Sequence, residues 1–300
     1  MKQIIPTLWL DDQAEQAAQF YCDTFNEGKI LRTDYYTDAG KEAHGHNKGD
    51  VMTVSFTIEG QQFIGLNGGP AFKITPAISF SVQCKSIEEV DELWNKLIDG
   101  GSALMPIDTY PFSRRYGWVV DKFGVSWQLN YVEHEVTQKI IPSLMFTQHL
   151  AGQAEEAINF YTSVFPESGV GLLSRYPAGQ EPEVEGTINY GEFKIFDYQM
   201  IAMDSAQAHE FGFTEGVSLV VNCDAQEEID RYSDALSAVP EAEVCGWLKD
   251  KYGVSWQIEP TILDEMQASG TPEQIESVMA AFMQMKRIDI AALETAYHQG

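Results

Sequence analysis

The sequence GWVVDKFGVSWQL at residues 117–129 returns almost unchanged as GWLKDKYGVSWQI at residues 246–258. In each copy an Asp-Lys-aromatic-Gly turn precedes a run rich in β-forming residues, which predicts a β-hairpin. The sequence around each copy also repeats. The chain is therefore expected to be a tandem of one domain, and its function has to be inferred from that domain.

The second strand of the predicted hairpin alternates between apolar and polar side chains. Ser126 and Gln128 share the polar face in the first copy, and Ser255 and Gln257 share it in the second. The apolar face suits packing under helices. A polar face in both copies is typical of a sheet exposed to solvent or of the wall of a wet cavity, and alternation alone does not decide between them.

Working outward from the hairpin, each half of the chain reads twice as a strand, a helix and further strands. This order predicts an α+β fold of four βαβββ-like units, in two domains at residues 1–135 and 138–261. No Gly- or Ser-rich linker separates the domains, so we expect them to pack together. Residues 262–300 predict a helical tail, in which Thr271 caps one helix and a second begins at Asp289. Its apolar side suits a brace on the second domain better than a partner-binding helix.

The predicted helices carry their apolar residues at helical spacing. In the first half the stripe beginning at Ala14 follows Asp12, which has Glu15 three residues further on, the spacing of a capping box. The later helix has Ser86 as its cap, again with Glu three residues on. We expect residues 103–115 to form a loop before the final hairpin.

Composition limits the classes of function. The formal net charge is −26 and the sequence pI is about 4.4, so a nucleic acid is not an expected partner, because binding phosphates needs a surface excess of Lys and Arg. No run approaches the roughly 18 apolar residues of a membrane span, and the first ten residues do not resemble a signal peptide. The four cysteines lack CxxC spacing, which favours reduced thiols and a cytoplasmic location.

Several motifs together resemble a known family. They are Ala-Glu-x-Ala-x-x-Phe-Tyr at residues 14–21 and 154–161, Asn-Gly-Gly-Pro at 67–70, the repeated stretch from Cys245 to Gln257, and the tail sequence at 285–294. In these the chain is similar to the PhnB-like, 3-demethylubiquinone-9 3-methyltransferase-like branch of the vicinal oxygen chelate superfamily. That superfamily includes the glyoxalases and the bleomycin-resistance proteins, and the resemblance covers both halves and the tail.

The resemblance implies tandem glyoxalase-like domains whose paired βαβββ units curl into open mixed sheets around cavities, with helices outside. In that picture the polar faces of the repeated strands line the cavities. The two tryptophans before the hairpin turns are either pocket walls or core. The loop at residues 103–115 either covers a cavity mouth and holds an anionic or planar ligand, or makes surface salt bridges. The candidate ligand-binding residues are Gln128, Ser126, Gln257, Ser255, Trp118, Trp247, Arg114, Arg115 and Tyr110.

The resemblance also bears on metal binding. Metal-using members of the superfamily place His near the start of a unit's first strand and Glu in its last strand. In this chain the corresponding residues are Pro, Ser and Gln. Gln is a weak, neutral metal ligand and Pro has no side-chain donor, so we expect neither a metal at the usual place nor another cofactor. The positions are near Pro6, Ser79, Pro142 and Ser218, and at Gln128 and Gln257.

His44 and His46 form an H-x-H pair in a predicted loop. If the loop folded inward, the pair could hold a metal; otherwise both are solvated loop residues. The second half has no equivalent pair at residues 177–185, which favours the second interpretation.

Three functions are compatible with these observations. The first is a metal-independent protein that binds or sequesters a small, partly aromatic organic molecule; the second is a metal-dependent lyase, isomerase or dioxygenase. The third is methyl transfer, because many members of this branch carry that label. Against the third, residues 65–70 run into a further strand rather than a helix, unlike the Gly-rich loop of a methyl-donor site. We expect the first function, in a monomer whose halves make the pairing that two copies make in single-domain relatives.

Overall fold

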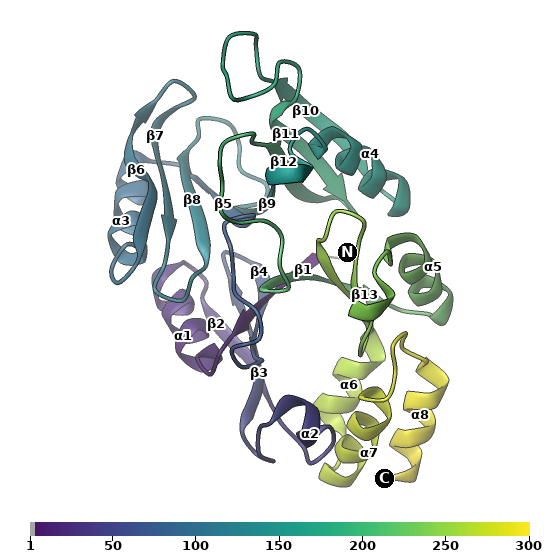
Figure 1. The fold of residues 1–300 in the computed structure, drawn as a ribbon. Helices are drawn as coiled ribbons and strands as arrows, with labels where there is room; N and C mark the ends of the chain where they lie inside the picture. The colour runs from purple at the N-terminus through teal and green to yellow at the C-terminus, as the bar shows by residue number, and fades with distance from the viewer. Residues whose placement is uncertain (1–3) are drawn as a thin grey trace.

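The computed structural model describes residues 4–300. Its strands form two open mixed sheets, and helices cover one face of each sheet (Figure 1). The predicted α+β fold of βαβββ units with a helical tail is confirmed. The seven-stranded sheet A contains, in spatial order, β14 (Trp247–Lys249), β15 (Ser255–Pro260), β13 (Val217–Cys223), β1 (Ile4–Leu10), β4 (Gln61–Asn67), β3 (Val51–Ile58) and β2 (Lys29–Tyr35).

Sheet B is also an open mixed sheet and has eight strands. The prediction of a loop at residues 103–115 was wrong, because this segment belongs to a hairpin of two long strands, β6 (Ser102–Tyr110) and β7 (Ser113–Val120). Pro106 is tolerated in β6 because β6 is an edge strand with an irregular register at that point. The spatial order is β10 (Gly169–Arg175), β11 (Ile188–Ile195), β12 (Tyr198–Asp204), β9 (Ile140–Phe146), β5 (Ile78–Cys84), β8 (Ser126–Tyr131), β7 (Ser113–Val120) and β6 (Ser102–Tyr110).

Each sheet takes one βαβββ unit from each half of the chain. In sheet A, β1 runs antiparallel to β13, with Thr7 opposite Ser218. In sheet B, β5 runs antiparallel to β9, with Ser79 opposite Ser143. Backbone hydrogen bonds therefore join the two halves through the middle of both sheets.

The four helices of the units cover the outer faces of the sheets (Figure 1). Their first turns are rich in Ala or acidic residues, and their buried residues repeat at helical spacing. Within residues 4–300 no helix is long and apolar enough to cross a membrane. The helices are α1 (Ala14–Thr24), α3 (Ile87–Leu97), α4 (Ala154–Val164) and α5 (Gln226–Leu236), with the short α2 (Lys41–His44), η1 (Gln148–Leu150) and η2 (Pro240–Ala242) between them.

The helix N-termini are capped in two ways. The Ser86 hydroxyl accepts a hydrogen bond from the Glu89 amide at 3.1 Å, as predicted for α3. The prediction of Asp12 as the cap of α1 was wrong: Asn67 Oδ1, at the end of β4, accepts from the Ala14 amide at 2.8 Å. A side chain at the end of a neighbouring strand thus satisfies the free N–H group that the local sequence leaves open.

The Asp of the repeated stretch ties the units of one half together. In the first half, Asp121 accepts hydrogen bonds from the Tyr21 hydroxyl on α1 and the Trp127 indole on β8, both at 2.8 Å. It also accepts from the backbone amides of Phe123 and Val125. Burial raises the pKa of Asp121, and the four donors oppose that rise. The repeat is therefore a structural joint as well as a hairpin.

The second half repeats this joint at Asp250. Its carboxylate accepts from the Tyr161 hydroxyl at 2.7 Å, the Trp256 indole at 2.9 Å and two backbone amides. Helix α4 of one unit is thereby held against the last hairpin of the next. Units of the same half meet through their helix-covered faces, whereas units of different halves meet edge to edge.

The loops that follow β4 and β12 lie side by side in opposite directions, and we call their contact the loop crossing. The Thr75 hydroxyl donates to the Gly212 carbonyl at 2.7 Å, and the Thr214 hydroxyl donates to the Lys73 carbonyl at 2.6 Å. At the crossing Gly216 lies so close to Lys73 that a Cβ on it would be 2.3 Å from the Lys73 carbonyl oxygen. Only glycine fits at this position without moving the backbone.

The tail forms three helices, of which α6 was not predicted: α6 (Thr261–Ser269), α7 (Pro272–Phe282) and α8 (Ile290–Gln299). Thr271 caps α7 in a capping box, and Asp289 caps α8, as the sequence predicts.

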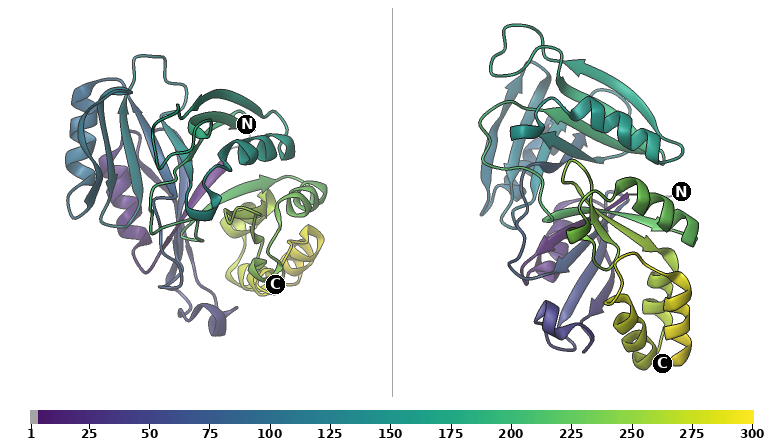
Figure 2. Two further views of the ribbon diagram at one scale, coloured as in Figure 1. Left: turned by 45° about the horizontal axis from the view of Figure 1, so that its top comes forward. Right: turned by 45° about the vertical axis from the view of Figure 1, so that its right-hand side comes forward.

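The tail contacts both edges of sheet A. Arg32, on the edge strand β2, donates to the Asp264 carboxylate on α6 at 2.6 Å. Near the opposite edge strand, β14, the amides of Cys245 and Gly246 donate to the backbone carbonyls of Met285 and Lys286. Figure 2 shows the tail helices beside the strands of both halves. The tail therefore braces the first half as well as the second, across the open side of sheet A.

Candidate functional site

The inner face of each sheet is the face without the unit helices. On sheet B, Gln128 Nε2 donates to Ser79 Oγ at 2.8 Å, and Gln128 Oε1 accepts from the Tyr116 hydroxyl at 2.9 Å. Ser143 lies opposite Ser79 on the neighbouring strand. Gln128 is only 7% exposed, so its amide is held within the protein and does not point into bulk water. We call Ser79, Gln128 and Ser143 the sheet B floor.

Sheet A has an equivalent set. Gln257 Nε2 donates to Ser218 Oγ at 2.7 Å, and Thr7 lies opposite Ser218. We call Ser218, Gln257 and Thr7 the sheet A floor. The sequence repeat aligns Cys245 with Tyr116, so the second copy has no phenol at that position. The structure thus brings both predicted glutamines to equivalent inner positions.

An apolar cluster, separate from the main core, covers the inner face around the sheet B floor. It includes the predicted Trp118, whose indole donates to the Ser126 hydroxyl at 2.6 Å. Tyr110, also predicted, packs at its edge and donates to the Pro106 carbonyl at 2.8 Å. This grouping of aromatic and flexible thioether side chains is typical of a surface that adapts to an organic ligand. The cluster consists of Tyr116, Trp118 and Met145, packed by Met105, Tyr110, Met203 and Phe211.

A hollow of about 230 Å³ opens on the same inner face, over β9 to β12. Ile141 and Ile201 form its apolar base, and Glu192, Lys194 and Gln199 contribute polar groups. Ile201 is the register partner of Ser143. The hollow therefore borders the sheet B floor.

The two predicted arginines do not lie together. Arg115 points to the helix-covered face, where it donates to Asp91 of α3 at 2.7 Å. Arg114 is exposed and pairs with Glu133 at 2.9 Å. The surface ion pairs that the sequence left as an alternative account for both side chains.

The inner face of sheet A carries a different aromatic set. The rings of Trp9 and Trp247 meet edge to face at 5.8 Å, and Phe72 packs on Trp9 at 4.8 Å. Ser255 is buried beside Gln257 on β15. The tail joins both edges of this sheet.

Glu259 is a charged residue of sheet A that the sequence-based selection missed. It follows Gln257 by two residues, so the same alternation that selected Gln257 places it on the inner face. Burial raises the pKa of Glu259 to about 7; nearby Asp264 adds to the rise, and Arg32 opposes it. Glu259 in turn helps to raise the pKa of the Cys245 thiol to about 11, after burial as the main cause. A raised pKa keeps the Cys245 thiol protonated, and so poorly reactive, at neutral pH.

The raised pKa of Glu259 predicts a pH-dependent stability. The folded protein keeps the proton up to pH about 7, whereas the unfolded chain releases it near the ordinary value of 4.5. Stability should therefore fall by about 3 kcal/mol as pH rises from about 4.5 to about 7, and change little above that. Because Glu259→Gln mimics the protonated form, it should match the wild type at pH 5 and be more stable at pH 8. Urea unfolding at both pH values tests this, and an equal difference at both would contradict it.

The two floors consist of hydroxyl and amide groups, which are weak, neutral ligands for a divalent ion. No three His, Cys, Asp or Glu side chains come together to hold an ion in the part of the chain that the structure describes. His44 and His46 both stack on the Tyr36 ring, at 4.3 Å between centroids.

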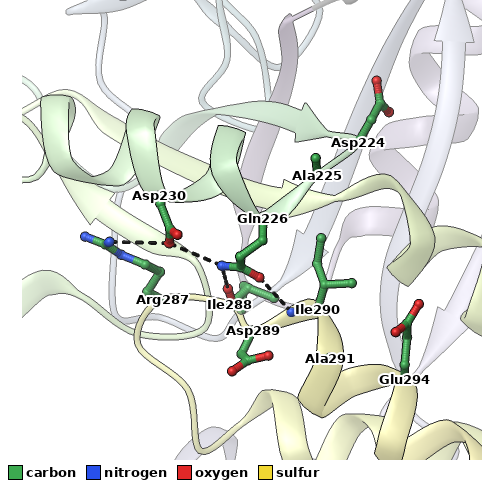
Figure 3. A pocket seen from close by; sticks show the side chains of 10 residues that line it. All are labelled: Asp224, Ala225, Gln226, Asp230, Arg287, Ile288, Asp289, Ile290, Ala291 and Glu294. Atoms are coloured by element: carbon green, nitrogen blue, oxygen red, sulfur yellow. Dashed lines mark hydrogen bonds and ion pairs between the residues drawn. The ribbon is translucent and has the colours of Figure 1, made fainter.

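A larger hollow, of about 590 Å³, lies elsewhere, between α5 and the start of α8 (Figure 3). Its central amide, Gln226, donates to the Ile288 carbonyl at 2.9 Å and accepts from the Ile290 amide at 2.9 Å. Arg287 is paired with Asp230 and Asp234. These groups join the tail to α5. The hollow therefore lies at the contact between the tail and α5, and it is not the candidate site.

Comparison with known proteins agrees with the architecture. The fold is shared with glyoxalase I from Zea mays, at 10% identity and a TM-score of 0.50 over 86% of this chain and 92% of that one. The chain is also similar to a PhnB protein from Bacillus cereus, which is provisionally described as a 3-demethylubiquinone-9 3-methyltransferase. The two are 35% identical over 43% of this chain and 98% of that one, with a TM-score of 0.39. No curated protein matches the chain.

The two halves also match one family separately. The matched segments are residues 2–130 and 138–259, which together span most of the chain and reproduce its internal repeat. The chain therefore belongs, twice over, to the family described as 3-demethylubiquinone-9 3-methyltransferase.

Proposed function

We propose that the chain is a small-molecule-binding protein that acts without a metal ion, and that its site is the inner face of sheet B. The observation that carries the proposal is the sheet B floor itself. A buried, oriented amide lies among aromatic and Met side chains and borders a hollow of about 230 Å³. Such a mixture of apolar walls and a few fixed polar groups is typical of sites for organic ligands.

Sheet B is preferred over sheet A because the tail bridges both edges of sheet A. We also propose that one copy of the chain suffices, since each sheet already combines a unit from each half. A single chain thus supplies the pairing that a dimer of single domains would provide.

The alternatives are an enzyme with a metal held elsewhere and the methyl transfer in the family's description. A Lewis-acid role at the floors would need charged or imidazole ligands that these positions lack. For methyl transfer, β4 ends at Asn67 and leads into a loop and then β5, not into a helix that could hold the donor's charged groups.

Thermal shift with a panel of small, neutral aromatic molecules tests the proposal, because a ligand that binds only the folded state raises Tm. Hits should bind equally with and without EDTA. Met203→Ala should weaken them about fivefold, a loss of about 1 kcal/mol of contact. Leu66→Ala, at the equivalent position of sheet A, is the matched control and should leave affinity unchanged.

Two results would overturn the proposal. One is stoichiometric Zn, Ni, Mn or Fe in the purified protein, with binding lost on chelation. The other is a saturable isotherm for S-adenosylmethionine, which would favour the methyl-transfer alternative.

A further inference from the structure

We infer that the sheet B floor binds the carbonyl oxygen of a neutral ligand. This inference rests on the proposed function and names the chemistry of the group that the site takes. It follows from accounting for the hydrogen bonds of three side chains, Ser79, Gln128 and Ser143.

The amide of Gln128 is fixed in one orientation. Its Oε1 accepts from the Tyr116 hydroxyl at 2.9 Å, and its Nε2 donates to Ser79 Oγ at 2.8 Å. A primary amide has two N–H donors, so one donor of Gln128 remains. Because Ser79 Oγ accepts from Gln128, its own O–H is also available to donate. The oriented amide thus leaves one N–H of Gln128 and the O–H of Ser79 free to donate, beside the acceptor lone pairs that the Gln128 and serine oxygens keep.

Ser143 adds a buried hydroxyl without a partner. The residue is 1% exposed, and its Oγ has no hydrogen bond within residues 4–300. A buried polar group normally pairs with protein, water or a ligand, because leaving it unpaired is costly. Ser143 lies directly across the strand pair from Ser79. Its hydroxyl is therefore a further group at the same floor that can donate a hydrogen bond as well as accept one.

An unpaired hydroxyl also occurs at the equivalent place in sheet A. Thr7 lies across from Ser218, which accepts from Gln257, and Thr7 Oγ1 is likewise buried without a partner in the described chain. Two independent sheets repeat an amide, a paired serine and an unpaired hydroxyl in one register. This repetition indicates a built feature of the fold and not an accident of packing in one sheet.

The charges around the floor favour a neutral ligand over an anion. The cationic groups nearest this face are already paired: Arg114 with Glu133 and Lys194 with Asp197. Glu192 adds a negative charge to the border of the hollow. The oxygen of a ketone or amide can accept hydrogen bonds from these groups without requiring a positive partner.

The experiment compares three probes of one shape by calorimetry: 1-indanone, indane and indane-1-carboxylate. In the wild type, 1-indanone should bind at least about fivefold more tightly than indane, the ratio that corresponds to about 1 kcal/mol. Ser143→Ala and Gln128→Leu should bring that ratio close to one. Thr7→Val, which removes the equivalent hydroxyl of sheet A, is the matched control and should keep the wild-type ratio.

A second readout separates a binding role from a structural one. The infrared carbonyl band of bound 1-indanone should shift to lower frequency in the wild type, and the shift should shrink in Ser143→Ala. Thermal melts of each variant establish that it is folded.

The outcomes that overturn the inference differ from those that overturn the proposed function. Equal binding of 1-indanone and indane, tighter binding of the carboxylate, or an unchanged ratio in Ser143→Ala would refute the carbonyl assignment alone. The last of these would mean that a water molecule pairs with Ser143. Absence of binding by all three probes and by the wider aromatic panel would refute both.

Discussion

Replacing Asp250 with Ala is expected to lower Tm by about 10 °C, the largest effect of any single substitution considered. Asp250 is 1% exposed and accepts hydrogen bonds from Tyr161, Trp256 and two backbone amides. Removing the carboxylate leaves four buried donors without a partner, at about 1 kcal/mol or more each. In a protein of this size each kcal/mol lost lowers Tm by roughly 2–3 °C, so a loss of about 4 kcal/mol lowers Tm by about 10 °C.

Differential scanning calorimetry of three variants measures this effect. Asp250→Asn keeps one acceptor oxygen but turns an N–H₂ group toward donors, so it should fall between Ala and the wild type. Asp99→Ala, an exposed residue in the turn after α3, is the control and should change Tm little. If Asp250→Ala and Asp99→Ala had the same Tm, the hydrogen bonds to the Asp250 carboxylate would contribute no stability.

The second large effect is expected at the loop crossing. In Gly216→Ala the new Cβ would be 2.3 Å from the Lys73 carbonyl oxygen and 2.4 Å from its carbon, both backbone atoms. The backbone of one loop must move, so we expect a loss of about 3 kcal/mol, at the upper end of the usual cost of overpacking. Urea unfolding at constant pH measures the change.

Gly169→Ala is the matched control for this experiment. Gly169 also lies in the second half, and a Cβ there would meet no atom within 4 Å. Equal stability of the two Ala variants would contradict the close approach of the two crossing loops.

Much of the local structure could be predicted from the sequence. The alternation in the repeated hairpin correctly placed Gln128 and Gln257 on one face, because side chains on a strand alternate whatever the surroundings. Helix spacing located α1 and α3, and local capping chemistry located the start of α7. These features depend on residues that are neighbours in the sequence.

The features that could not be predicted depend on distant residues. Asn67 caps α1 from another strand, 53 positions away, so Asp12 was the wrong choice. Arg115 faces α3 because the hairpin continues to residue 113 and sets its alternation, which a predicted loop cannot show. The pairing of units across the halves was expected only from the resemblance to single-domain relatives, since the repeat alone is compatible with either partner.

The pairing across the halves has an evolutionary consequence. In a symmetric homodimer a single gene encodes both clefts, so every substitution changes both at once. Here the two sheets draw on different codons, and one cleft can change while the other keeps its chemistry. Two differences are of a kind that a duplicated and fused gene permits and a symmetric homodimer forbids. Cys245 aligns with Tyr116 in the repeat, and the tail joins the edges of sheet A.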